Sequence, residues 1–269
     1  MLQAKNGTLP MDGTTLDYIA FGCGTEPLVM IPGLGDGLRT VRGMALGFSL
    51  QYGALAERFR VYCFSRKNEL AEGSTTRDYA DDLARAMDAL GITGATVLGV
   101  SQGGMIAQHL TLRHPEKVKR LIICVTLARQ NATVQSVVSR WISMAEAGDF
   151  RQMFIDTAEK SYSPAYLRRM RWMLPLAAWM SRPKEPQRFL IQARSCLTHD
   201  AYAELPRIAC PTLVMGGGQD MIVGPAAAGE IAAQIPGSEV HIWPEYGHAA
   251  YEEAKDFQSR IVAFADAHP

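Results

Sequence analysis

The chain has 269 residues, of which 48% are hydrophobic and 20% charged, which suits one large α/β domain with a sizeable core. Its 27 basic and 27 acidic residues balance, so no strong field attracts nucleic acid or an anionic membrane surface. The N-terminal stretch MLQAKNGTLPMDG lacks the apolar core of a secretory signal and no apolar run reaches transmembrane length, so we expect a cytoplasmic protein that binds neither nucleic acid nor membrane.

The cysteines are odd in number and scattered, which disfavours a disulfide framework. Three of the five lie in apolar, strand-like runs, so we expect buried free thiols rather than disulfides or metal ligands. The five positions are Cys23, Cys63, Cys124, Cys196 and Cys210. No phosphate-binding loop, metal-ligand cluster or cofactor fingerprint occurs, and neither a cofactor nor a metal is expected. The sequence does not predict the oligomeric state.

Extended segments and helices alternate over the first half of the chain. Two extended runs within residues 2–22 flank the turn dipeptide Asp12–Gly13 and predict a hairpin, and residues 36–48 form a predicted glycine-containing loop. The remaining strands are predicted at Leu28–Ile31, Val61–Ser65, Ala95–Val100 and Val118–Val125, and the helices at Leu50–Phe59, Thr76–Leu90 and Gly103–His114. This alternation requires a parallel sheet with helices on both faces.

The alternation stops between residues 128 and 205, where helical segments follow one another without a strand. Helices are predicted at 133–147, 149–160, 164–180 and 185–197. The simple interpretation is a helical subdomain whose methionines and tryptophans form its own core. A second interpretation, compatible with the first, is a cap whose inner face forms an apolar substrate pocket, with Trp141, Met144, Trp172 and Trp179 as candidate lining residues.

Alternation resumes after residue 206. Strands are predicted at Cys210–Met215 and Glu239–Trp243, and helices at Pro225–Gln234 and 250–266. The predicted fold is therefore α/β, with a mostly parallel eight-stranded sheet, helices on both faces and a helical cap insertion. We assign residues 1–127 and 206–269 to the core domain and residues 128–205 to the cap subdomain.

A candidate nucleophile lies between the predicted strand Ala95–Val100 and the helix that follows. Ser101 is flanked by Gly99 and Gly103, where a side chain would collide with the neighbouring strand or helix. A serine in so sharp a turn adopts a strained backbone, which costs about 1–3 kcal/mol. The strain exposes the hydroxyl at the carboxyl end of the sheet, above a helix N-terminus that favours developing negative charge.

A serine hydroxyl needs a base, and His248 is the best placed of the histidines. It follows the last strand, at the same carboxyl edge as Ser101, whereas the others lie on the helix after the serine, in the helical region, within a strand or at the C-terminus: His109, His114, His199, His241 and His268. Asp220, in the loop after strand Cys210–Met215, is the candidate carboxylate that orients the imidazole. Glu245 is the rival acid, and a solvated loop aspartate is the alternative interpretation of Asp220.

An oxyanion hole requires two N–H donors directed at the substrate carbonyl oxygen. One candidate is the backbone N–H of Gln102, directly after the serine. The other is expected from the loop Pro32–Gly33–Leu34–Gly35, with Leu34 the best candidate, because its glycines let the backbone approach the substrate closely.

With these loops in place, the chain resembles the α/β-hydrolase superfamily, in the branch of small bacterial esterases, 3-oxoadipate enol-lactonases and carbon–carbon bond hydrolases. The resemblance covers residues 14–127 and 206–265. It rests on VMIPGLG at 29–35, LGVSQGGMIAQHLTLRHPEKVKRLII at 98–123, CPTLVMGGGQD at 210–220 and PEYGHAAYEE at 244–253. Arg66 matches the arginine of the D-x-R-G-x-G loop usual in this branch, whereas Ser65 replaces its acid.

The resemblance implies a hydrolase that cleaves small, largely apolar carboxylic esters or lactones through a Ser-His-Asp triad and an acyl-enzyme. Carbon–carbon bond hydrolysis or perhydrolysis by the same triad is the alternative, and a ligand-binding protein that is not an enzyme is a third hypothesis. Residues 131–205 carry ten Lys/Arg and seven Asp/Glu. Solvated arginines explain this excess most simply; the alternative is an anionic substrate group near Arg140, Arg168 or Arg171.

Overall fold

The computed structural model of the protein describes residues 3–170, 172–173 and 186–269, and they form a layered α/β structure. Eight strands make one sheet in the order β1-β2-β4-β3-β5-β6-β7-β8. The strands are β1 (Lys5–Met11), β2 (Thr14–Phe21), β3 (Glu26–Ile31), β4 (Phe59–Lys67), β5 (Ala95–Val100), β6 (Val118–Cys124), β7 (Thr212–Gly217) and β8 (Glu239–Trp243). Only the β1–β2 and β2–β4 pairs are antiparallel, which confirms the predicted mostly parallel sheet.

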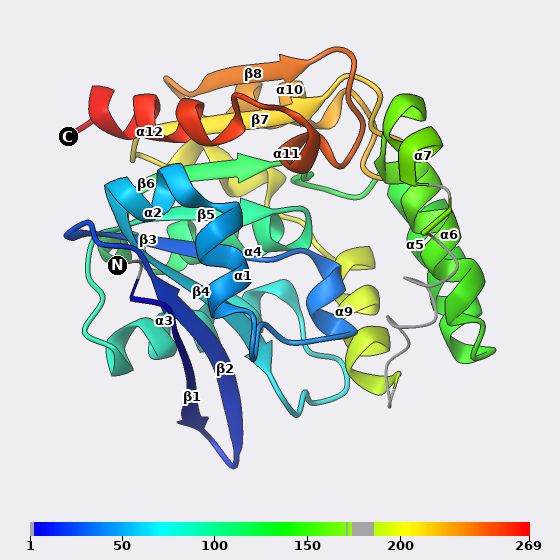
Figure 1. The fold of residues 1–269 in the computed structure, drawn as a ribbon, viewed down its shortest axis with the longest axis horizontal. Coiled ribbons are helices and arrows are strands. Elements are labelled where there is room, and N and C mark those ends of the chain that lie inside the picture. Colours follow the sequence, from blue (N-terminus) through cyan, green and yellow to red (C-terminus); the bar gives the residue numbers. More distant parts are fainter. Residues whose placement is uncertain (1–2, 171, 174–185) are drawn as a thin grey trace.

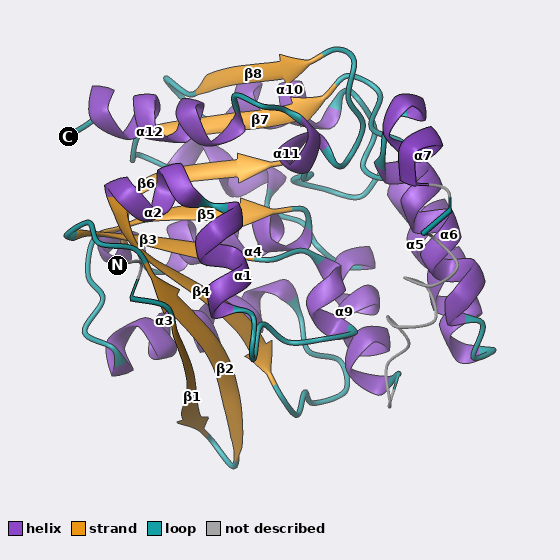
Figure 2. Ribbon diagram, viewed as in Figure 1, coloured by secondary structure: helices purple, strands orange, loops and turns teal. Residues whose placement is uncertain are grey.

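Helices cover both faces of this sheet (Figure 2). One face packs against α3 (Thr76–Ala89), α4 (Gln102–Arg113) and α10 (Ala227–Gln234). The other packs against α1 (Ala45–Gln51), α2 (Gly53–Arg58), α11 (Ala250–Glu253) and α12 (Phe257–Ala267). Short 3₁₀ helices occur between the longer elements: η1 (Leu34–Gly37), η2 (Pro115–Lys117) and η3 (Tyr202–Arg207).

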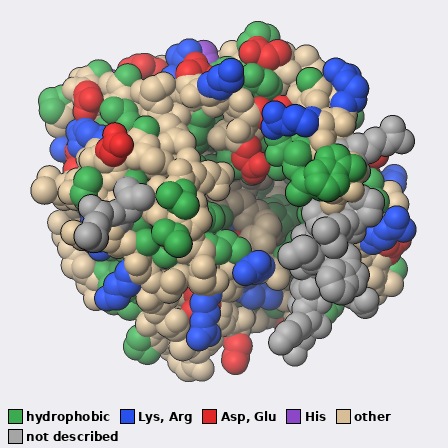
Figure 3. All heavy atoms as spheres, viewed as in Figure 1, with side chains coloured by type: hydrophobic (Ala, Val, Ile, Leu, Met, Phe, Trp, Pro, Cys, Tyr) green, Lys and Arg blue, Asp and Glu red, His purple; other side chains and the backbone are tan. Residues whose placement is uncertain are grey.

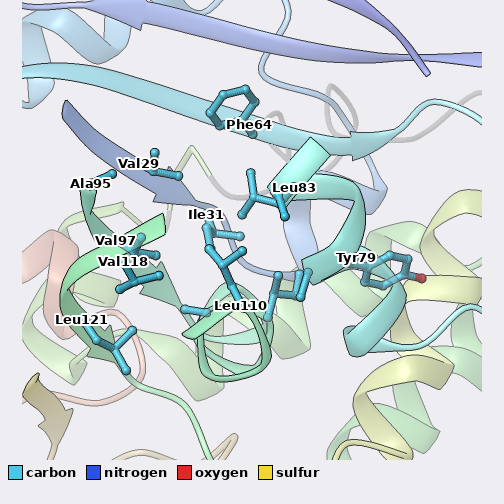
Figure 4. Close-up of a cluster of buried hydrophobic side chains, with 14 of the residues drawn as sticks. Val29, Ile31, Phe64, Tyr79, Leu83, Ala95, Val97, Leu110, Val118 and Leu121 are labelled. Carbon is cyan, nitrogen blue, oxygen red and sulfur yellow. The ribbon is translucent and has the colours of Figure 1, made fainter. Parts of the chain in front are cut away.

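The core on the first face forms because strands and helices each present one apolar side to the other. Val29, Ile31 and Val97 from adjacent parallel strands meet Leu83 of α3 and Leu110 of α4 (Figure 4). Each such fully buried aliphatic side chain contributes about 1.5–3 kcal/mol relative to an exposed one. The capping box at Thr75 and Asp78 fixes where α3 begins, because each side chain satisfies the backbone N–H of the other.

The helical region follows β6. It contains α5 (Ala132–Glu146), α6 (Phe150–Ser161), α7 (Pro164–Met170) and α9 (Gln187–Leu197). The parallel strands point their carboxyl ends toward α5, α6 and α7 (Figure 1). α5, α6 and α9 share a core with residues that follow β6 and β7, among them Leu127, Ile222 and Val223. No helix in the described part of the chain is long and apolar enough to cross a membrane.

Several predicted boundaries were wrong. The predicted loop 36–48 contains the second half of η1 and the first turn of α1, and the predicted helix Leu50–Phe59 is two helices that meet at Tyr52. The closing helix 250–266 is interrupted after Glu253, because Ala254 is extended with ψ of 118°. The five cysteines are free as predicted, but Cys23 is exposed and Cys210 only half-buried.

Candidate active site

Ser101 occupies a strained turn between β5 and α4. Its φ of 55° and ψ of −121° lie in a backbone region that residues other than glycine rarely adopt, which agrees with the predicted strain. A Cβ on Gly99 would overlap the backbone of Gly103, and one on Gly103 would overlap the carbonyl oxygen of Ile31. The two glycines therefore let the turn pack directly on β3 and hold the serine at the N-terminus of α4.

The structure brings His248 and Asp220 to this serine. His248 Nε2 lies 2.9 Å from Ser101 Oγ, and His248 Nδ1 lies 2.8 Å from Asp220 Oδ2. A carboxylate can only accept hydrogen bonds, so Nδ1 carries the proton and Nε2 is left to accept from the serine hydroxyl. The three side chains thus form one hydrogen-bonded chain from Ser101 through His248 to Asp220.

Asp220 is held rigidly, with only 3% of its surface exposed. While Oδ2 accepts from the imidazole, Oδ1 accepts from the backbone N–H groups of Ile222 at 2.8 Å and Val223 at 2.9 Å. Both oxygens of this buried carboxylate thus accept hydrogen bonds from the protein. The solvated-loop interpretation of this aspartate is therefore wrong.

The loops that carry the acid and the base are in backbone contact. Gly218 donates to the carbonyl of Trp243 at 2.8 Å, and Gln219 donates to that of Tyr246 at 3.0 Å. Gly217 and Gly218 permit this approach, because a Cβ on either would overlap the 244–247 backbone. β7 consequently runs two residues beyond its predicted end, to Gly217.

The two candidate oxyanion donors each begin a helix near Ser101. Gln102 is the first residue of α4 and Leu34 the first of η1, positions whose backbone N–H groups have no partner within the helix. The loop before η1 lies against the serine, since a Cβ on Gly33 would be 3.2 Å from Ser101 Cβ.

A cavity of about 520 Å³ opens at Ser101 and His248, and Figure 3 shows the molecule hollowed and bordered by hydrophobic side chains on this face. Its walls are mainly apolar, with Val41, Met44 and Phe48 from the α1 side and Trp141, Phe154 and Ala158 from α5 and α6. Trp141 is fixed by a 2.8 Å hydrogen bond from its indole N–H to Asp156. A drug-sized apolar ligand fits a volume of this order.

The other predicted pocket residues do not line this cavity where the structure describes them. Met144 is partly buried against the core shared by α5, α6 and α9 and does not line the cavity. Trp172 is 78% exposed, and Trp179 lies outside the described residues. Among the candidate anion-binding arginines, Arg140 is 3.4 Å from Asp156, Arg168 is exposed, and neither lines the cavity; Arg171 lies outside the described residues.

Sequence reasoning did not name several polar side chains that line the cavity. Tyr52, Tyr162 and Tyr251 line it together with Glu252, which accepts a 2.6 Å hydrogen bond from the Tyr162 hydroxyl. Burial is the main cause that raises the pKa of each of these tyrosines, so all three remain neutral donors at neutral pH. Tyr251 and Glu252 lie in the stretch PEYGHAAYEE that follows the last strand, whereas the isolated positions of Tyr52 and Tyr162 carry no spacing signal.

The end of β6 supports the nucleophile in a way that the sequence did not indicate. Val125 has φ of 48°, a strained conformation for a β-branched residue. It turns the chain so that the Thr126 hydroxyl donates to the carbonyl of Ser101 at 2.8 Å. The backbone is therefore strained both at Val125 and at Ser101.

Comparison with known proteins agrees with this geometry. The sequence profile of the alpha/beta hydrolase fold family matches residues 26–255. RutD of Caulobacter sp. strain K31, a candidate carbamate hydrolase, is 23% identical over 257 residues, which cover 89% of this chain and 90% of RutD. The pimeloyl-[acyl-carrier protein] methyl ester esterase of Chromobacterium violaceum is 29% identical over 202 residues, covering 73% of this chain and 80% of that protein.

Solved structures share the fold. The enol-lactonase of Burkholderia xenovorans LB400 superposes with a TM-score of 0.84 at 22% identity, covering 97% of this chain and all of the other. The chain therefore belongs to the alpha/beta hydrolase fold family. It is a hydrolase enzyme, as the sequence predicted.

Proposed function

We propose that this enzyme is a serine hydrolase of carboxylic esters or lactones with small, largely apolar substituents. The observation that carries the proposal is the hydrogen-bonded chain from Ser101 through His248 to Asp220 at the mouth of an apolar cavity. The names of two similar proteins, a methyl ester esterase and an enol-lactonase, describe action on the same kind of bond.

In the proposed reaction His248 Nε2 accepts the proton of Ser101 as the hydroxyl oxygen attacks the substrate carbonyl. The oxyanion of the tetrahedral intermediate accepts hydrogen bonds from the backbone N–H groups of Leu34 and Gln102, and Asp220 stabilises the imidazolium. His248 then gives its proton to the leaving alcohol, and an acyl group remains on Ser101. Water then attacks the acyl carbonyl while His248 accepts one of its protons, and His248 returns that proton to Ser101 Oγ as the acid leaves.

We further propose that residues 128–205 act as a cap that shapes the acyl or alcohol site. Trp141, Phe154 and Ala158, all from this region, face Ser101 across the cavity and support this assignment. A cap of this kind excludes water and binds the apolar part of a substrate, which strengthens the hydrogen bonds to the oxyanion.

Replacing the nucleophile tests the proposal. Ser101→Ala is expected to lower kcat for p-nitrophenyl butyrate on the order of 1,000-fold or more, and to abolish covalent labelling by a fluorophosphonate. Ser259→Ala, at an exposed position on α12, is the matched control and should react like the wild type. Wild-type turnover by the Ser101→Ala enzyme would refute the mechanism. A diketone ring-fission product, assayed beside the esters, distinguishes ester from carbon–carbon bond hydrolysis.

A further inference from the structure

A cluster of charged and amide side chains lies buried behind the loop that carries Leu34. Its members come from four separate elements, and we refer to them as the Arg66 cluster: Asp36 of η1, Arg66 of β4, Gln102 of α4, and Arg188 and Gln192 of α9. Arg66 is 4% exposed and Gln102 is fully buried. Such groups are expensive to bury and add little net stability compared with apolar side chains. Their presence beside the reaction centre therefore points to a role in placing it.

One amino group of Arg66 joins the two sides of the candidate oxyanion hole. Arg66 Nη2 donates to the carbonyl oxygen of Pro32 at 2.6 Å and to the side-chain Oε1 of Gln102 at 2.7 Å. Pro32 lies two residues before Leu34, in the loop that brings the Leu34 N–H to the serine. Gln102 supplies the second N–H from its own backbone. A single guanidinium thus fixes the separation of both candidate donors.

The rest of the cluster holds the backbone of Arg66 and the 3₁₀ helix that carries Asp36. Asp36 Oδ2 accepts from the Arg66 backbone N–H at 3.1 Å and from Arg188 Nη2 at 2.5 Å. Arg188 also donates to the backbone carbonyls of Arg66, at 3.0 Å, and Lys67, at 3.1 Å.

The amide of Gln102 is held from the side of α9. Its Nε2 donates to the carbonyl of Gln192 at 2.8 Å and to Ser195 Oγ at 3.1 Å. The side chain is therefore held at both ends, by Arg66 at its oxygen and by α9 at its nitrogen. These contacts tie Gln102, whose backbone N–H is the second candidate donor, to both Arg66 and α9.

We propose that Arg66 is a positioning residue of the hydrolase reaction, which holds the Leu34 and Gln102 N–H groups at the spacing that an oxyanion requires. The inference rests on the proposed function. Oxyanion donors act by being aligned before the reaction, and a displacement of about 1 Å in such a site can cost about 100-fold in rate. Loss of Arg66 should therefore weaken the stabilisation of the transition state and leave substrate binding unchanged.

Arg66→Met removes the guanidinium while keeping a long apolar side chain. We expect kcat for p-nitrophenyl butyrate to fall about 10- to 100-fold with KM nearly unchanged. The affinity for a trifluoromethyl ketone, which forms a tetrahedral adduct with the serine, should weaken by a similar factor, whereas that for the product butyrate should not change. Arg66→Lys should recover part of kcat, because its ammonium also has several protons on one nitrogen.

Arg120 offers a matched control at the opposite end of the sheet. It is equally buried on β6, where it bonds to Thr96 at 2.9 Å, to Glu26 and to the carbonyl of His268. Arg120→Met should lower the free energy of unfolding but leave kcat unchanged at temperatures where the protein is folded. Equal losses of kcat in the two variants, or equal losses of butyrate and ketone affinity in Arg66→Met, would overturn the proposal.

A second variant gives the same test if Arg66→Met does not fold. Gln102→Met keeps the backbone N–H and removes the side chain that Arg66 holds, so kcat and ketone affinity should again fall together. Unchanged values would overturn the proposal. In the folded double variant the two losses should not add, because both act on one linkage. Turnover by Ser101→Ala would instead refute the proposed function itself, whatever the Arg66 variants show.

Discussion

Gly103 of α4 packs against Ile31 of β3 so closely that a Cβ on the glycine would overlap the Ile31 carbonyl oxygen and lie 2.9 Å from that of Pro32. The carboxyl end of β3 and the start of α4 are thus pressed together beside Ser101. Both the strained serine turn and the Pro32–Gly35 loop depend on this contact.

Gly103→Ala should therefore destabilise the fold and impair the site. We expect a loss of about 1–3 kcal/mol in the free energy of unfolding, because the added methyl group forces backbone apart, and a fall in kcat of at least about 10-fold. Urea unfolding and ester hydrolysis measure the two effects. Gly229→Ala on α10, where a Cβ meets open space, is the matched control and should stabilise by about 0.5–1 kcal/mol. A neutral Gly103→Ala would contradict the close packing.

Asp220→Asn tests the orienting carboxylate. The amide oxygen can still accept from Ile222 and Val223, but an amide NH₂ facing His248 favours a proton on Nε2, the wrong tautomer for a base. We expect kcat to fall about 1,000- to 10,000-fold with little change in stability or KM. Glu245→Gln replaces the rival acid, which is exposed, and should leave kcat unchanged. If instead the glutamine variant loses activity, the acid is misassigned.

Ala158→Phe tests whether the cavity wall from α6 selects the substrate. Ala158 is buried and lines the cavity, so the larger ring should occupy space that a long acyl chain needs. Hydrolysis of p-nitrophenyl octanoate should fall about 10- to 100-fold relative to acetate, corresponding to overpacking of about 1–3 kcal/mol. Ala165→Phe, on exposed surface of α7, should leave the acyl-chain profile unchanged. An unaltered octanoate-to-acetate ratio in Ala158→Phe would place the acyl chain elsewhere.

Two buried histidines predict acid sensitivity of the fold. His109 and His199 contact each other edge to face, with ring centroids 5.0 Å apart. Burial lowers the pKa of His109 from its ordinary 6.5 to about 4 and that of His199 well below 6.5. Between those values the unfolded chain binds more protons than the folded one, so the free energy of unfolding falls as pH drops from about 6.5 to about 4.

The contribution of His109 is at most about 3 kcal/mol over this window. His109→Leu removes the titrating group and should lose less stability than the wild type between pH 7.5 and pH 5, as measured by urea unfolding at each pH. Identical losses in the two proteins would show that His109 is not responsible.

Local sequence signals predicted the regular elements best where burial and turn chemistry agreed. β5 and β8 have their predicted bounds, because each is a short run closed by residues that end a strand. The break at Tyr52, directly before Gly53, and the interruption after Glu253, where Ala254 is extended, were missed. Met144 and Trp172 were misplaced because residue type does not reveal which neighbour a helix face meets.

The sequence by itself determined the α/β hydrolase class and the three loops at the carboxyl edge of the sheet, because parallel strands must end at one edge and each loop carries its own signature. Tertiary structure alone decided the 2.9 Å approach of His248 to Ser101, the cavity wall from α5 and α6, and the hydrogen bonds that link Asp36 to Arg66 and Arg188. These hydrogen bonds join residues between 30 and 152 positions apart, and nothing local in the chain encodes their distances.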